Sequence, residues 1–268
     1  MPELPEVETT RRALIPLLEG QTLTAVTTSG KRLRQPVPPL DSLVGTTVTA
    51  LARRAKYLLL GLSNSQTLLI HLGMSGRLTT APPHAKHTHL TLTTAHASVS
   101  LYDPRRFGLI LLTPTATLHN HPLLAPLGPE PLDDTAFTPT HLYASSHARN
   151  TPLKPFLMDA RTVVGVGNIY ASESLFRARL SPTMPAGKLT RKQAESLVEH
   201  IRQTLTDAIH AGGSSLRDYA HPSGQLGNFQ STFNVYGRKG QPCPACGTPI
   251  THITQAQRST FYCPVCQK

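Results

Sequence analysis

The sequence has no tryptophan, few aromatic residues and a shortage of acidic ones. Only 5% of its 268 residues are aromatic, and 15 Asp and Glu stand against 26 Lys and Arg, giving a formal net charge of +11. Long apolar runs are also missing, since Tyr57–Leu62 and Leu109–Leu112 fall far short of the roughly 20 residues that span a bilayer. The opening MPELPEVETT is acidic and has no apolar signal core. A membrane-spanning helix is therefore excluded, and secretion is not expected.

The remaining composition is typical of a globular protein with a polyanionic partner. A hydrophobic content of 39% with 24 prolines argues against a coiled coil or a disordered chain, and the length allows one large domain or two modest ones. The excess of positive charge favours nucleic acid as the partner. Charge alone leaves open a basic surface that has no specific partner.

All four cysteines lie near the C-terminal end, in two C-x-x-C pairs separated by sixteen residues. This spacing fits a zinc pattern in which two tight turns present four thiolates to one tetrahedral Zn²⁺. Disulfides and a redox C-x-x-C are the alternatives; an intracellular chain disfavours the first, and two matched pairs disfavour the second. We predict one structural Zn²⁺ that holds a small β-hairpin. Its ligands are Cys243, Cys246, Cys263 and Cys266.

The cysteine-containing end of the chain carries positive charge without any acidic residue. From Tyr219 to Lys268 there is no Asp or Glu. Arg258 falls between the two cysteine pairs, near the expected hairpin tip. A zinc-held β-ribbon with an arginine at its tip suits a DNA groove. A solvated surface arginine is the alternative.

Hydrophobic patterning divides the rest of the chain into a β-rich part and a helical part. An apolar stripe predicts a helix over 3–19, although Pro16 leaves its end open. From 21 to 113, short Thr/Val/Leu-rich segments alternate with turn residues, which predicts a β-sandwich or barrel. A linker over 114–135 and a helix over 190–211 follow. Examples of the expected strands are Thr22–Thr28, Thr46–Ala50, Tyr57–Leu62, Thr67–Leu72, Thr88–Thr93 and Ser98–Tyr102.

The first residues could carry amine chemistry. A small second residue permits removal of Met1, after which Pro2 would have a free secondary amine; α-amino groups titrate near pH ~8. Such an amine can attack an electrophilic sugar carbon and form an iminium, with Glu3 as the adjacent acid or base. A Met-Pro start without any chemical role is the common alternative.

Seven segments occur in one order along the chain. They are MPELPEVETTRR, HLGMSGRL, DPRRFG, TPLKPFLMD, VVGVGNIYASESLF, VYGRKGQPC and QRSTFYCPVCQ. This set closely resembles the bacterial formamidopyrimidine-DNA glycosylases, which repair 8-oxoguanine, and the resemblance covers the whole chain. It implies an α+β multidomain fold. Its expected parts are an N-terminal helix with a β-sandwich over 1–113, the linker over 114–135, a helix–two-turn–helix domain over 136–230 with a lesion-capping loop at about 213–225, and a zinc finger with a β-hairpin over 231–268.

The resemblance also implies roles for individual residues. Pro2 would attack C1′ of the damaged nucleoside, and Glu3 would move protons during ring opening and elimination. Lys56 would lie near the lesion and its phosphate, and His71 would contact phosphate. In the gap left by the extruded base, the expected residues are Met74, Arg105 and Phe107, with Arg106 on the backbone phosphate.

A second group of residues resembles the family's phosphate contacts. Asn168 follows a glycine-rich turn that fails the dinucleotide fingerprint, because Tyr170 stands in place of the third glycine. We expect Asn168 near a helix N-cap, where free backbone N–H groups favour an anion. Lys154 matches a lesion-proximal lysine, Tyr236 a phosphate contact, and Arg258 the arginine of the zinc finger.

Some positions are expected to matter less. Glu6 and Glu173 match acidic positions of the family, yet glutamates on helix faces are usually solvated. Phe156 replaces an expected tryptophan, which should alter packing only. The histidine-rich stretch is read as surface and strand residues without a metal. Its members are His84, His87, His89 and His96.

The sequence therefore predicts a bifunctional DNA glycosylase/AP lyase that removes oxidised purines by β,δ-elimination. Double-stranded damaged DNA is its expected partner, and the family resemblance implies a monomer. Two alternatives stay open. One is an enzyme similar to endonuclease VIII, which prefers oxidised pyrimidines; the other is a zinc protein that recognises damage without catalysis, which intact Pro2 and Glu3 disfavour.

Overall fold

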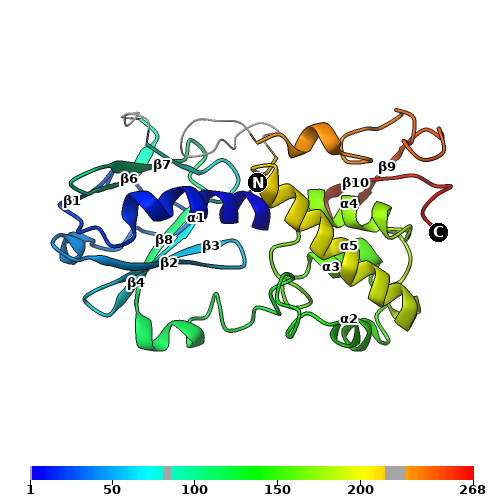
Figure 1. Cartoon of the computed structure of the whole chain (residues 1–268), viewed down its shortest axis with the longest axis horizontal. Coiled ribbons are helices and arrows are strands. Elements are labelled where there is room, and N and C mark those ends of the chain that lie inside the picture. The colour runs from blue at the N-terminus through cyan, green and yellow to red at the C-terminus, as the bar shows by residue number, and fades with distance from the viewer. Residues whose placement is uncertain (1, 81–85, 215–226) are drawn as a thin grey trace. The chain divides into compact units, whose positions relative to one another are not determined.

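The computed structural model describes residues 2–80, 86–214 and 227–268. The chain forms two compact units (Figure 1). Unit 1 comprises Met1–Ala125 and Ile209–Gln230, and unit 2 comprises Pro126–Ala208 and Ser231–Lys268. In this division, the described residues 209–214 and 227–230 group with the N-terminal part of the chain.

Unit 1 is a helix packed on two four-stranded antiparallel sheets, ordered β1-β6-β7-β5 and β2-β3-β4-β8. Helix α1 spans Leu4–Leu18 and continues two residues past Pro16, which is exposed. Leucines, valines and isoleucines from both sheets and from α1 form one core. The strands are β1 Ala25–Thr28, β2 Val48–Arg54, β3 Tyr57–Leu62, β4 Gln66–His71, β5 Arg77–Thr79, β6 Thr88–Thr93, β7 Ser98–Tyr102 and β8 Leu109–Pro114.

Three predicted strands, β3, β6 and β7, have the expected bounds. Two observed strands were not predicted. Strand β5 has only three residues, too few for a periodic signal, and β8 is an apolar run whose first residues are buried. A short apolar run shows no alternation of apolar and polar residues, because both faces of such a strand can be buried.

Unit 2 contains the helices and the C-terminal hairpin. The long helix α5, Arg191–His210, follows a capping box in which Thr190 N–H and Oγ1 donate to Gln193 Oε1 at 2.9 and 3.0 Å. Gly212 and Gly213 follow its end with φ of +77° and +80°. The other helices and strands of unit 2 are α2 Pro139–Ser146, α3 Leu153–Met158, α4 Asn168–Arg177, β9 Thr251–Gln255 and β10 Arg258–Tyr262. Short 3-10 turns also occur. They are η1 Asp41–Leu43 and η2 Thr115–Asn120 in unit 1, η3 Ala186–Lys188 in unit 2, and η4 Phe229–Thr232 at the unit boundary.

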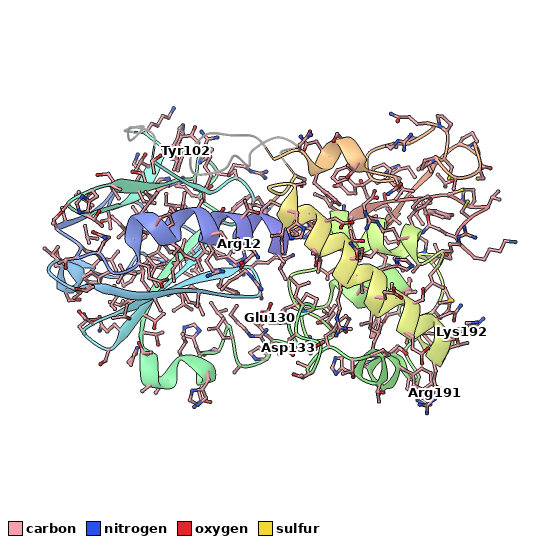
Figure 2. All side chains as sticks on the ribbon, in the orientation of Figure 1. Arg12, Tyr102, Glu130, Asp133, Arg191 and Lys192 are labelled. Atoms are coloured by element: carbon pink, nitrogen blue, oxygen red, sulfur yellow. The ribbon has the colours of Figure 1, made fainter. Side chains whose placement is uncertain are left out.

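The first residues of α5, Arg191 and Lys192, are exposed and extend away from the ribbon (Figure 2). The Arg191 guanidinium lies over the ring of Tyr143 in α2, 4.8 Å from its centroid. Among the described residues, no helix is long and apolar enough to cross a membrane.

Candidate active site and metal centre

The two residues expected to react lie at the start of α1, and both are buried. Glu3 is the N-cap residue of the helix and forms a capping box with Glu6. The Glu3 backbone N–H donates to Glu6 Oε2 at 2.8 Å. This hydrogen bond fixes the peptide that follows Pro2, so the position of the Pro2 nitrogen depends on the helix cap.

Glu6 is only 1% exposed, so it is not a solvated residue of the helix face. Its Oε1 accepts hydrogen bonds from the Ser214 N–H at 2.8 Å and from Ser214 Oγ at 3.0 Å. A Cβ at Gly213 would lie 3.1 Å from the same oxygen. Glu6 therefore joins the start of α1 to the segment after α5. The predicted lesion-capping loop continues from here, but residues 215–226 lie outside the described part of the chain.

Lys56 and His71 come together at one end of the β2-β3-β4-β8 sheet. Lys56 occupies the turn between β2 and β3, and His71 pairs with Tyr57 in the antiparallel ladder. The Gly73 N–H donates to His71 Nδ1 at 2.9 Å, which leaves the proton on Nε2. Burial, with smaller effects from the charges of Lys56 and Arg34, lowers the pKa of His71 to about 4. At neutral pH His71 is thus an uncharged N–H donor.

The residues expected to fill the DNA gap lie on two neighbouring loops. Met74 is half-buried in the turn after β4, whereas Arg105 and Arg106 are exposed and Phe107 is 44% exposed. The Arg105 guanidinium stacks on the Phe107 ring at 4.8 Å. Arg106 has a φ of +57°. One exposed loop thus presents the Phe107 ring and the guanidinium donors of Arg105 side by side.

Sequence reasoning missed Asp103, which anchors this loop. Its side chain is fully buried, and its oxygens accept from Ser75 Oγ at 2.8 Å and from the Gly108 N–H at 2.7 Å. The only sequence signal was its place at the head of DPRRFG. Nothing in the sequence shows whether such a carboxylate faces solvent or the interior.

In unit 2, Lys154 is buried and its ammonium group has three acceptors. Its Nζ donates to Asn168 Oδ1 at 2.6 Å, to the Ser259 carbonyl at 2.7 Å and to Thr260 Oγ1 at 3.0 Å. Asn168 is the first residue of α4, and Gly167 is its N-cap. Lys154 therefore connects the N-terminus of α4 to strand β10. It also holds the Asn168 amide, whose Nδ2 lies 3.4 Å from the Tyr236 hydroxyl.

Glu173 is, like Glu6, only 1% exposed. Its Oε2 accepts from the backbone N–H and the side-chain Nδ2 of Asn234, at 2.9 and 3.0 Å. Its Oε1 accepts from the N–H groups of Val235 and Tyr236, at 3.0 and 2.8 Å. One carboxylate thus orders the loop that presents Tyr236.

The hairpin tip carries Arg258 as the first residue of β10. The turn before it uses two left-handed residues, Ala256 and Gln257, with φ of +45° and +61°. Arg258 is exposed and lies beside a hollow that Lys154 and Thr260 also line. The predicted place of this arginine at the tip of the ribbon is therefore observed.

The four cysteine sulfurs all lie within 4.8 Å of one another. The Cys243–Cys266 and Cys246–Cys263 sulfur pairs are 3.9 and 3.5 Å apart. A tetrahedral Zn²⁺ with Zn–S bonds of about 2.3 Å requires separations of about 3.8 Å, whereas a disulfide requires about 2.05 Å. The sulfur arrangement fits one structural Zn²⁺ and does not fit disulfides.

The histidine-rich stretch forms no metal site among the described residues. His89 is buried, with Nδ1 2.9 Å from Ser29 Oγ and Nε2 3.0 Å from the Asp103 carbonyl. His96 is exposed and His87 is half-buried. His84 lies outside the described residues.

An N-terminal helix on a β-sandwich, a helical unit and a four-cysteine ribbon with an exposed arginine define a zinc-ribbon protein suited to DNA. Residues 1–110 match the model of the formamidopyrimidine-DNA glycosylase N-terminal domain, and residues 127–220 match that of the H2TH domain of the same enzymes. Residues 240–268 match a zinc finger found in FPG and IleRS.

Full-length relatives have the same family name. The chain is 54% identical over 274 residues to the formamidopyrimidine-DNA glycosylase of Thiobacillus denitrificans and 50% identical over 277 residues to that of Dechloromonas aromatica, with 100% of each chain covered. The chain belongs to the formamidopyrimidine-DNA glycosylase family. It is therefore a DNA-repair enzyme of the bifunctional glycosylase/AP lyase class.

Solved structures agree with this assignment. The crystal structure of the MutM (FPG) protein from Thermus thermophilus has a TM-score of 0.90 and 43% identity, covering 99% of this chain and 98% of that one. Lactococcus lactis Fpg with DNA containing an abasic site has a TM-score of 0.91 and 34% identity, covering 99% of both chains. The predicted family, fold class and structural zinc are thereby confirmed.

Proposed function

We propose that this chain excises 8-oxoguanine and formamidopyrimidines from duplex DNA, with Pro2 as the nucleophile. The observation that carries the proposal is the burial of Pro2 and Glu3 at the cap of α1, where Glu6 holds the Glu3 peptide. Related structures hold DNA with an abasic site, Fapy-dG or carbocyclic 8-oxo-G, which supports this substrate class. We further propose that the enzyme acts on chromosomal DNA in the bacterial cytoplasm.

The chemistry needs an amine and a carboxyl group at one sugar. After removal of Met1, the Pro2 nitrogen attacks C1′, the bond from C1′ to the base breaks, and the base leaves with a proton. Glu3 protonates O4′ as the sugar ring opens, which leaves an iminium between Pro2 and C1′. The iminium acidifies the C2′ proton, because the electron pair released there is delocalised onto nitrogen. Loss of this proton expels the 3′ phosphate, and loss of the C4′ proton then expels the 5′ phosphate. Water hydrolyses the remaining iminium and frees the Pro2 amine.

Other residues hold the DNA in this scheme. Lys56 and the uncharged His71 donate to the phosphate beside the lesion, and Arg106 contacts the backbone. Met74, Arg105 and Phe107 occupy the gap and offset the cost of unstacking a flipped base, which is a few kcal/mol. In unit 2, the proposed phosphate contacts are Asn168, Tyr236 and Arg258. Lys154, which the family resemblance places near the lesion, holds the Asn168 amide in this arrangement.

The zinc ion contributes structure, because four thiolates fill its coordination shell and leave no site for a reacting water. Cys243, Cys246, Cys263 and Cys266 hold it. Together with the β9–β10 ladder they keep the Arg258 turn in place.

Borohydride trapping tests the proposal. The zinc-loaded full chain is mixed with a duplex that carries one 8-oxoguanine opposite cytosine, and borohydride reduces the iminium to a stable amine. Wild type should give a covalent protein–DNA band, and peptide mapping should place the cross-link on residue 2 with Met1 absent. Pro2→Gly keeps an amine and should give a weaker band.

Two control outcomes separate the alternatives. Tight binding of the same duplex without any covalent band would contradict the lyase step and favour damage recognition alone. A band that forms only with a thymine-glycol duplex would favour the oxidised-pyrimidine enzyme.

A further inference from the structure

The two loops proposed to fill the DNA gap interlock at their backbones. Gly73 has a φ of +64°, and a Cβ there would lie 2.4 Å from the Phe107 carbonyl carbon. A Cβ at Gly108 would lie 3.0 Å from Asp103 Oδ2. The contact at Gly73 admits only glycine, and the contact at Gly108 is tight. The backbone beside Met74 is thus set directly against the backbone of Phe107.

One buried carboxylate joins the same two loops through hydrogen bonds. Asp103 is 0% exposed, and its two oxygens divide their partners between the loops. Oδ1 accepts from Ser75 Oγ, next to Met74, at 2.8 Å. Oδ2 accepts from the N–H of Gly108, next to Phe107, at 2.7 Å. In the part of the chain that the structure describes, Asp103 has no ion pair, so these loop donors stabilise its charge.

The backbone of Asp103 is anchored to the sheet behind the loops. Its N–H donates to the His87 carbonyl at 2.9 Å. Its carbonyl accepts from the Arg106 N–H at 3.3 Å and lies 3.0 Å from His89 Nε2. Burial lowers the pKa of His89, which favours a neutral ring that donates from Nε2. Asp103 is therefore fixed on one side and holds both loops on the other.

The exposed side chains of Arg105 and Phe107 stack on each other. Their position relative to DNA is therefore set by the loop backbone that carries them. An arginine fork distinguishes one base from another only when its donors meet the acceptors of that base in the correct geometry. An anchor that fixes the loop thus affects base discrimination without contacting DNA.

We propose that Asp103 is a positioning residue that holds Met74, Arg105 and Phe107 as one gap-filling unit and thereby sets the preference for the base opposite the lesion. This inference rests on the proposed function. Catalysis and discrimination of the opposite base then require different parts of the protein. Schiff-base formation requires Pro2 and Glu3, whereas discrimination of the opposite base requires the two loops.

The test compares Ser75→Ala and Asp103→Asn with wild type on two kinds of DNA. Ser75→Ala removes one donor with little change in volume, so the protein should fold. In Asp103→Asn, the amide oxygen can still accept from Gly108 while the amide nitrogen faces Ser75. Thr67→Ala is the matched control, because Thr67 is 2% exposed and its Oγ1 lies 2.9 Å from Thr115 Oγ1, away from both loops.

Excision of 8-oxoguanine is measured opposite cytosine and opposite adenine, and borohydride trapping is measured on a single-stranded abasic oligonucleotide. The single strand has no opposite base, so its trapping requires Pro2 and Glu3 but no discrimination of the opposite base. Ser75→Ala should lower the ratio of excision opposite cytosine to excision opposite adenine by roughly tenfold, the scale of one lost hydrogen bond to a charged acceptor. Asp103→Asn should lower it less, and Thr67→Ala should leave it unchanged. Trapping on the single strand should stay within about twofold of wild type in all three variants.

An unchanged cytosine-to-adenine ratio in both loop variants would overturn the proposal. So would a parallel fall of single-strand trapping and duplex excision, which would indicate a general loss of structure. A wild type that traps neither substrate would instead contradict the proposed function itself, and the inference with it.

Discussion

At the scale of single residues, the site depends on buried charges whose hydrogen-bonding capacity is used. Glu6 accepts from Glu3 and Ser214, and Glu173 accepts four hydrogen bonds around Tyr236. Lys154 donates to three acceptors. A charge buried in this way is costly to leave without its partners. These residues therefore set the positions of their neighbours.

The pKa of His71 gives a prediction at this scale. Because burial and the nearby Lys56 and Arg34 charges lower the pKa to about 4, the ring should be neutral throughout the physiological range. The unfolded chain takes up the proton below about 6.5, so the contribution of His71 to stability should be lost as the pH falls from there through about 4. An NMR titration of the His71 ring checks this. A His71 midpoint near the ordinary histidine value of about 6.5 would contradict it.

At the scale of elements, α1 is attached to the sheet through Glu8. Arg11 and Arg12 of the same helix and Arg53 of β2 all donate to its carboxylate, at 2.8 to 3.2 Å. Arg11 Nη1 also donates to the Leu51 carbonyl at 3.0 Å. Helix α1, which begins directly after Pro2 and Glu3, is thus anchored to β2 by polar contacts as well as by its apolar face. Arg12 has the most exposed side chain of these three arginines.

Replacement of Glu8 by Gln should destabilise unit 1. Although burial opposes it, hydrogen bonds from Arg11 and Arg12 and the charges of Arg11 and Arg53 lower the pKa of Glu8 from 4.5 to about 2. Its contribution should be present above about pH 4.5 and lost as the pH falls through about 2. At neutral pH we expect a loss of roughly 1–2 kcal/mol in the free energy of unfolding. Urea denaturation measures it, and equal stability of Glu8→Gln and the exposed control Glu195→Gln would contradict it.

The zinc ribbon gives a second prediction at the scale of elements. Cys246→Ser should lower the zinc content well below one ion per chain, because three thiolates remain. Without the ion the β9–β10 hairpin loses its anchor, and Arg258 loses its fixed position. Elemental analysis and binding to a duplex with an abasic-site analogue measure both effects. Full zinc content would contradict Cys246 as a ligand, and full affinity after loss of the ion would contradict the structural role of the ion.

At the scale of the whole molecule, the net charge of +11 should make DNA binding strongly dependent on salt. The logarithm of the binding constant should fall linearly with the logarithm of salt concentration. Arg258→Ala should reduce the slope by about 1, as expected for one lost phosphate contact. The exposed Lys192, at the start of α5, offers a control because no DNA contact is assigned to it (Figure 2). Equal slopes for the Arg258 variant and wild type would contradict a phosphate contact at the hairpin tip.

The sequence by itself determined the features that depend on local spacing. Two C-x-x-C pairs specify a zinc ribbon because each pair needs only a tight turn. The helix predicted over 190–211 is observed as Arg191–His210, since an apolar residue at every fourth position and a capping box are local signals. The seven ordered segments identified the family without any knowledge of contacts.

Only the tertiary structure decided which polar residues are buried and what they hold. Ser214 is 208 positions from Glu6, and Ser259 is 105 from Lys154. Asp103 lies 28 positions from Ser75, with three strands between them. A carboxylate or an ammonium group looks the same in a sequence whether it faces water or a partner, because its burial depends on segments brought together by folding.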